Sequence, residues 1–162
     1  MLIKSDNMKS LKVITKEVEG WFKDHREING VYIVKDLDLR SKNNLKYPFV
    51  SIQPDDPRFD GDLITYTFKI VLADILCVDN EFSSLEIENS LLQVANDLIA
   101  AFDENDDFDI NRNISIEFFE DDFTDRCCGL VFYLNISQFK EQNVCAIPLV
   151  DGFDYNLDFN MQ

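Results

Sequence analysis

Positively charged residues are scarce in this sequence of 162 residues, where 15 Lys and Arg stand against 31 Asp and Glu, for a formal net charge of −16. The isoelectric point is correspondingly low, near 4.2. Such a field repels nucleic-acid phosphates and anionic lipid surfaces, because proteins hold both by neutralising them with Lys and Arg. We therefore expect neither sequence-specific nucleic-acid binding nor attachment to a membrane.

Long apolar segments are also missing. The N-terminal stretch "MLIKSDNMKS" has no apolar core of the kind that secretory signals carry. The most apolar run, "LITYTFKIVLADIL", is interrupted by Lys69 and Asp74 and is shorter than the roughly 20 residues that cross a bilayer. We expect an intracellular protein whose four cysteines stay reduced, namely Cys77, Cys127, Cys128 and Cys145.

Histidine is nearly absent, since His25 is the only one. A Ser-His-Asp triad needs a histidine base, and zinc sites need Cys or His ligands paired at spacings such as C-x2-C, which this sequence lacks. The adjacent Cys127 and Cys128 point to opposite faces if that segment is a strand. We therefore interpret the cysteines as small apolar packing residues. The five glycines form neither GxGxxG nor GxxxxGK[ST], so no phosphate-binding loop is predicted.

Two acidic clusters remain as candidates for chemistry. "DENDDFDIN" resembles a calcium loop, but the sixth and twelfth positions, which need Gly and Glu, hold Phe108 and Ile114. "EFFEDDFTD" could hold Mg²⁺ or serve acid–base catalysis, although a charged strand edge that prevents aggregation explains it equally well. We expect no enzymatic activity, no catalytic residue, no metal and no cofactor. The candidate oxygen ligands of the first cluster are Asp103, Asn105, Asp107 and Asp109. The acids of the second cluster are Glu117, Glu120, Asp121, Asp122 and Asp125.

What the sequence does contain is regular periodicity. Apolar residues recur at three- and four-residue steps in 11–21 and again in 87–102, which predicts two amphipathic helices. Asn7 is a plausible cap for the first helix, and Ser83 with Glu86 has the spacing of a capping box for the second. His25 follows the first helix, where it can interact with the helix C-terminus.

Strands are predicted at 31–40, 47–54, 63–76, 113–123 and 129–136, and the segment 55–62 is predicted to be a loop or hairpin tip. The clearest strand has Ile64, Tyr66, Phe68, Ile70 and Leu72 on one face, which is typical of a half-buried antiparallel strand. These elements predict an α+β fold in which an antiparallel sheet of about four to five strands carries two helices on one face. Residues 1–148 would form one domain, followed by an acidic, aromatic tail at 149–162.

The order of the elements resembles a known family. The chain begins with an N-terminal helix, which is followed by "YPFVSIQP" and by a strand ending in "VLADIL". After these come the helix "EIENSLLQVANDLIAAF", the segment "ISIEFFEDDFTDRCCGLVFYLNI" and the ending Cys145-Ala-Ile-Pro148. This arrangement, over residues 8–148, resembles the small tail-terminator and head–tail connector proteins of tailed bacteriophages, particularly those of phages that infect Bacteroidetes, including the crAss-like group. The double cysteine and the acidic tail depart from the family pattern.

The resemblance implies a structural virion protein, assembled in the bacterial cytoplasm, that forms a homo-oligomeric ring around the DNA channel. Its partners would be the portal, adaptor or tail proteins of the virion neck, and DNA would pass through without sequence-specific contact. A negative lumen suits passage, because basic residues would retain DNA. Sheet residues left over after one face packs on the helices are candidates for the subunit interface. These candidates are Phe119, Asp121, Asp122, Phe123, Val131 and Tyr133.

A second hypothesis is an acidic DNA mimic that inhibits a DNA-binding enzyme, because regularly spaced carboxylates can imitate phosphates. A mimic is expected to be a monomer or dimer that binds a cationic enzyme with steep salt dependence. Against this hypothesis, the acids gather in loops and do not form rows along the second helix.

Overall fold

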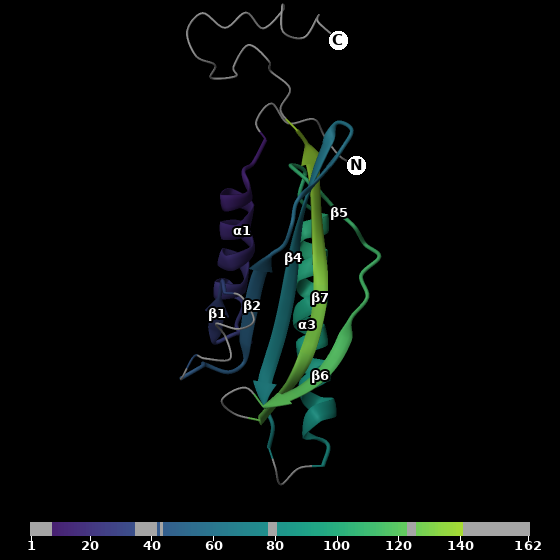
Figure 1. The fold of residues 1–162 in the computed structure, drawn as a ribbon. Helices are drawn as coiled ribbons and strands as arrows, with labels where there is room; N and C mark the ends of the chain where they lie inside the picture. Colours follow the sequence, from purple (N-terminus) through teal and green to yellow (C-terminus); the bar gives the residue numbers. More distant parts are fainter. Residues whose placement is uncertain (1–7, 35–41, 43, 78–80, 123–125, 141–162) are drawn as a thin grey trace, which may run out of the picture.

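The computed structural model describes residues 8–34, 42, 44–77, 81–122 and 126–140, and shows two helices packed on a single sheet (Figure 1). The side chains of residues 121 and 122 are not described. The predicted tail at 149–162 lies outside the described residues, as does Cys145. In chain order the elements are α1 (Leu11–Asp24), β1 (Gly30–Tyr32), β2 (Phe49–Pro54), β3 (Arg58–Asp60), β4 (Leu63–Ile75), α3 (Ser83–Asp103), β5 (Asp109–Ile110), β6 (Glu117–Asp122) and β7 (Arg126–Phe139).

The sheet has seven strands in the order β1-β2-β4-β7-β5, with β3 also pairing with β4 and β6 also pairing with β7. The α+β class is confirmed, but the predicted count of four to five strands was too low. The short strand β3 lies in the segment predicted as a loop or hairpin tip, and β5 lies in a segment predicted as an acidic loop. The sheet is also mixed, because β1 runs parallel to β2 while the other pairs are antiparallel. The connection 33–48 is long enough for the crossover that parallel pairing requires.

The centre of the sheet is the long antiparallel pair β4–β7, in register from Leu63↔Phe139 to Ile75↔Cys127. Successive side chains of a strand alternate between the two faces, so this register decides which residues are buried together. The even-numbered residues of β4, from Ile64 to Leu72, form one core with those of β7, from Leu130 to Ile136, as their period-two pattern predicted.

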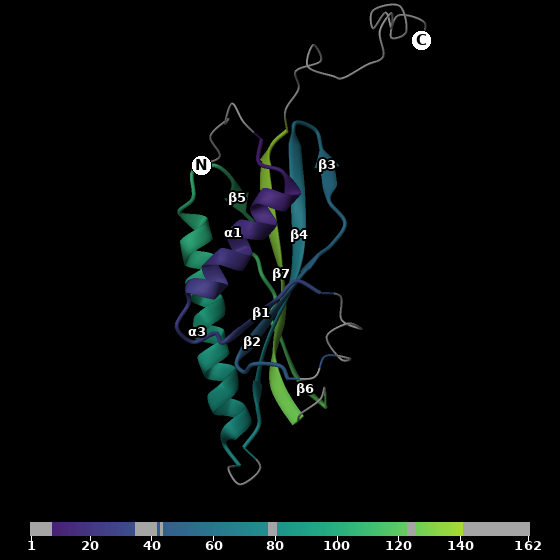
Figure 2. The ribbon, with the colours of Figure 1, turned by 90° about the vertical axis from the view of Figure 1, so that its left-hand side faces the viewer.

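Both helices pack on that face of the sheet, as predicted (Figure 2). α1 contributes Ile14, Val18 and Phe22 to the core, and the apolar stripe of α3 runs from Leu91 to Phe102. Neither helix combines the length and hydropathy that a bilayer-spanning helix of the described chain would require.

The helix starts differ from the predicted caps. α1 is capped by Ser10, whose hydroxyl accepts a hydrogen bond from the Val13 amide at 3.3 Å. The predicted cap, Asn7, lies outside the described residues. At α3 the N-cap residue is Phe82, with no side-chain cap, so the predicted capping box is wrong. The Ser83 hydroxyl instead accepts a hydrogen bond from the Cys77 amide at 3.0 Å, and thereby holds the end of the β4–α3 connection.

A two-residue turn joins β3 to β4, and its first residue, Gly61, has φ +58°, a conformation that favours glycine. A second glycine is required at Gly129 of β7 for a different reason. A Cβ atom there would lie 1.8 Å from the Leu72 carbonyl oxygen and 2.8 Å from the Ala73 Cα. At this position β4 and β7 lie so close together that the side chain can be no larger than the hydrogen atom of glycine.

We expect Gly129→Ala to lower the free energy of unfolding by about 3 kcal/mol, because the methyl group would force two backbones apart in the middle of the sheet. Urea unfolding followed by circular dichroism measures the loss. Gly20→Ala in α1 is the matched control, since a Cβ there meets nothing within 4 Å. That control is expected to gain about 0.5–1 kcal/mol from helix propensity. A Gly129→Ala midpoint equal to that of the unsubstituted protein would contradict the close approach.

Candidate functional site

The sheet face opposite the helices, hereafter the open face, is built from the odd-numbered residues of β4 and β7. No helix of the described chain lies on it (Figure 2). These positions contain no acidic residue, although the whole chain carries a charge of −16. They are Leu63, Thr65, Thr67, Lys69, Val71, Ala73, Ile75, Cys127, Gly129, Val131, Tyr133, Asn135, Ser137 and Phe139.

Polar side chains at one end of the open face are paired with each other across the strands. The Thr67 hydroxyl donates to the Asn135 side-chain oxygen at 2.6 Å, and the hydroxyls of Thr65 and Ser137 lie 2.7 Å apart. Because these groups already have partners, covering them with another surface costs less than covering unpaired polar groups. This end of the face can therefore be desolvated without matching donors from a partner.

The other end of the open face carries a small apolar cluster of its own. Phe49, Ala73 and Cys127 are buried there. Tyr32 and Tyr47 pack against Phe49 with ring centroids 6.0 and 5.4 Å away. Tyr32 and Tyr47 thus cover part of this end, although Ile75 at the end of β4 is 48% exposed. The rest of the exposed face lies in the middle and at the polar end.

The predicted interface residues fall partly on the open face. Val131 and Tyr133 lie on it in β7, and Tyr133 is 48% exposed. Phe119 also lies on it, opposite Gly129, and packs against the cluster around Phe49. Asp121 and Asp122 end β6, opposite Cys127 and Arg126 of β7, but their side chains are not described. Phe123 lies outside the described residues.

The adjacent cysteines point to opposite faces, as the sequence indicated. Cys127 is buried in the cluster on the open face, whereas Cys128 lies on the helix side with its sulfur 3.9 Å from the Ser84 carbonyl oxygen. Burial raises the pKa of the Cys128 thiol to about 11, and the carboxylates of Glu88, Glu120 and Asp74 add to the effect. Both residues are fully buried and act as packing groups in the sheet. The raised pKa also makes the Cys128 thiol a poor nucleophile.

The other candidates from the sequence lie apart from the open face or on its rim. His25 ends α1, and its ring nitrogen lies 3.2 Å from the Asp97 carboxylate of α3. In the acidic loop, Asp107 pairs with Lys9 at 2.8 Å and Asp103 pairs with Arg112 at 2.8 Å. Within the described ranges, no three His, Cys, Asp or Glu side chains gather as metal ligands would. Glu117 lies at the rim, opposite Val131.

Three features were not found from the sequence. Gln138 is buried and exchanges hydrogen bonds with the backbone of Lys9, which joins the segment before α1 to β7. Phe59, in the β3–β4 hairpin, is 71% exposed and lies under the Lys140 ammonium at 5.4 Å. A groove opens between α1 and α3. The exposed Phe59 sits beside Gly61 in a predicted hairpin tip, so the sequence held a signal for that feature.

No protein-family model and no curated protein matches the chain.

We expect the cysteines to react in the order of their exposure. Alkylation of the native protein at pH 8 should label the exposed Cys77 well before Cys127 and Cys128, because both are fully buried. At that pH only about one Cys128 thiol in a thousand is ionised, given its pKa of about 11. Peptide mass mapping over time identifies the labelled positions, and a sample in urea should label all of them. Equal rates at Cys77 and Cys128 in the native protein would contradict this arrangement.

Burial raises the pKa of Asp74 above its ordinary value of 3.8. A hydrogen bond from the Ile75 amide at 2.8 Å lowers this pKa, but by less than burial raises it. The folded state therefore binds this proton more tightly than the unfolded state, and stability falls as pH rises from 3.8 through the raised pKa. We expect Asp74→Asn to raise the melting temperature at pH 7 and to lose that gain below pH 3.8. The control Asp56→Asn, at an exposed loop position, should change little at either pH. A gain that persists undiminished at low pH would contradict the prediction.

Proposed function

We propose that this chain is a structural subunit of a tailed-phage head–tail connector or tail terminator, and that copies join into a ring around the DNA channel through the open face. The observation that carries the proposal is the acid-free middle of that face on a chain of net charge −16. The resemblance in element order points to the same role.

The composition of the open face suits a contact between proteins. Interface cores are depleted of charged residues and enriched in aromatic ones. Tyr133 is 48% exposed in the middle of the face, beside Val131 and the paired Thr67 and Asn135. Lys69, in register with Tyr133, is the one charged residue that β4 and β7 contribute to the open face.

The distribution of charge also favours this face for self-association. Two copies of an acidic protein repel each other, and the cost is lowest where the surfaces that meet carry no acids. Around the open face, charged residues return only at the rim. They are Arg58 beside Thr65, Asp60 beside Leu63, Asp109 beside Ser137, Glu117 beside Val131 and Asp121 beside Cys127. Acids elsewhere on the ring would repel DNA phosphates, which suits a channel that lets DNA pass.

The test places an acidic residue in the middle of the open face. We expect light scattering to show a ring for the unsubstituted protein, either alone or after mixing with the portal, adaptor or tail proteins of the same virion. Tyr133→Asp should remain a monomer in the same mixture, because each contact would then lose an aromatic ring and would have to remove a carboxylate beside Lys69 from water. Circular dichroism checks that the variant is folded.

Phe118→Asp is the matched control. Phe118 has similar exposure, 52%, but pairs with Leu130 and so lies on the helix side of the sheet. It should assemble as the unsubstituted protein does. The proposal fails if the protein stays monomeric with every neck partner, or if both variants assemble alike. A monomer that instead binds a DNA-binding enzyme, with affinity that falls steeply in salt, would support the DNA-mimic hypothesis.

A further inference from the structure

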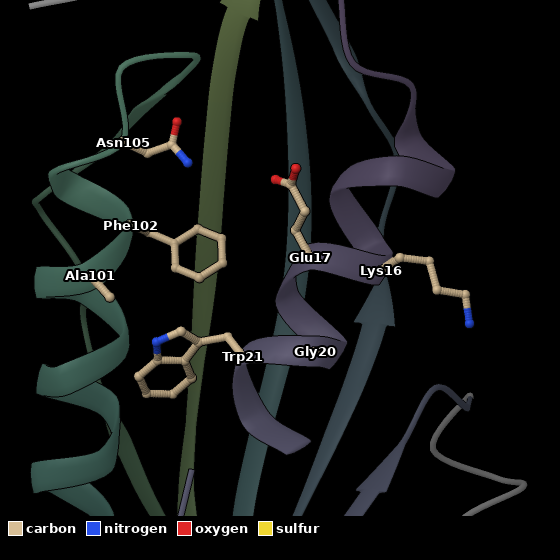
Figure 3. A pocket seen from close by; sticks show the side chains of 7 residues that line it. All are labelled: Lys16, Glu17, Gly20, Trp21, Ala101, Phe102 and Asn105. Carbon is tan, nitrogen blue, oxygen red and sulfur yellow. The ribbon is translucent and has the colours of Figure 1, made fainter. Parts of the chain in front are cut away.

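A groove of about 360 Å³ lies between α1 and α3, on the side of the molecule away from the open face (Figure 3). The rings of Trp21 and Phe102 extend into the space between the two helices, and Glu17 extends along it, whereas Lys16 is directed away. The seven residues that line the groove are Lys16, Glu17, Gly20 and Trp21 of α1, Ala101 and Phe102 of α3, and Asn105 just after α3.

The groove is open because small residues face it from both helices. Gly20 lies inside α1, where glycine costs roughly 1 kcal/mol relative to alanine. Nothing in the described chain requires that glycine, since a Cβ atom there would meet no atom within 4 Å. Ala101 is exposed on the opposite helix. The helix thus carries a destabilising residue that leaves room beside Trp21, and none of the described residues fills that room.

The charges around the groove are negative. Glu17 and Asp107 share one ammonium group, that of Lys9, at 2.7 and 2.8 Å, so this cluster keeps an excess negative charge. The C-terminal end of α3 reaches the groove at Phe102 and carries the negative pole of the helix dipole, with no basic residue in its last turn. Glu104 and Asp106 follow it and are exposed. The ammonium of Lys16 is held at 2.9 Å by Glu19.

The apolar lining and the negative charge of the groove indicate which kind of molecule can bind there. A second copy of the chain carries a charge of −16, and its own tail carries Asp151, Asp154 and Asp158, so the acidic groove repels both. A cationic group on an apolar segment is attracted by the carboxylates and can also rest on the indole face of Trp21. Amphipathic helices bind grooves of this kind through their apolar side chains.

We propose that the α1–α3 groove binds a basic, amphipathic segment of a partner protein, with its apolar side chains against Trp21 and Phe102 and a Lys or Arg beside Glu17. This inference does not rest on the proposed ring, since the groove and the open face lie on opposite sides of the molecule. It adds a second contact surface, with a partner of opposite charge.

Trp21 is the only tryptophan of the chain, so its fluorescence reports directly on the groove. The probe is a short amidated peptide with a leucine face and an arginine face, titrated into the full-length protein. We expect a saturable change in the Trp21 emission, weakened by added salt because the attraction is electrostatic. The same peptide with glutamate in place of arginine should produce no change.

Two alanines of α3 provide the matched variants. Ala101→Arg places a cation and a long side chain in the groove, and should weaken binding at least about tenfold. Ala100→Arg adds the same charge at the neighbouring exposed position, which does not line the groove, and should weaken it by no more than roughly twofold. Circular dichroism checks the fold of both. The proposal is overturned if the arginine peptide fails to bind, if the glutamate peptide binds as well, or if the two variants weaken binding equally.

Discussion

The register of β4 against β7 is the constraint on which the rest of the structure depends. It runs without interruption from Leu63↔Phe139 to Ile75↔Cys127. A shift by one residue would exchange the two faces, so that Ile64 and Phe132 would face away from the helices and Thr65 and Tyr133 would face them. The close approach of Gly129 to Leu72 and the buried apolar residues of one face both oppose that shift. The same register that makes the core therefore makes the open face.

The excess of acidic residues is compatible with this fold because no Asp or Glu of the described residues is fully buried, although Asp74 is partly so. The core under the helices is apolar, and the acids cluster in the loop after α3 and along β6. A few lysines are shared among them, as where Lys9 contacts both Glu17 and Asp107. The charge thus contributes little to the fold itself and chiefly determines which surfaces another molecule can approach.

The sequence predicted the features that depend on local periodicity. The stripes of α1 and α3 and the alternation in β4 identified two helices, one buried sheet face and the opposite orientations of Cys127 and Cys128. It failed where pairing with another segment of the chain decides the outcome. The parallel pairing of β1 and the short strands β3 and β5 depend on which strand lies next to them, and Ser83 bonds the Cys77 amide in place of capping α3. Of the candidate interface residues, the period-two pattern suffices to put Val131 and Tyr133 on one face. The groove could not be predicted, because it requires the spacing between two helices that only the sheet positions.

The two surfaces differ in a way that would keep their partners separate. The open face is nearly free of charge in its middle, so contact with another copy there avoids most of the repulsion between acidic subunits. The groove combines an apolar floor at Trp21 and Phe102 with carboxylates, so it favours a cationic segment and disfavours a copy of the chain. Because the sheet and both helices stand between them, occupation of one surface leaves the other accessible. Under the two proposals, each subunit would contact a further copy through the open face and a basic segment of another protein through the groove.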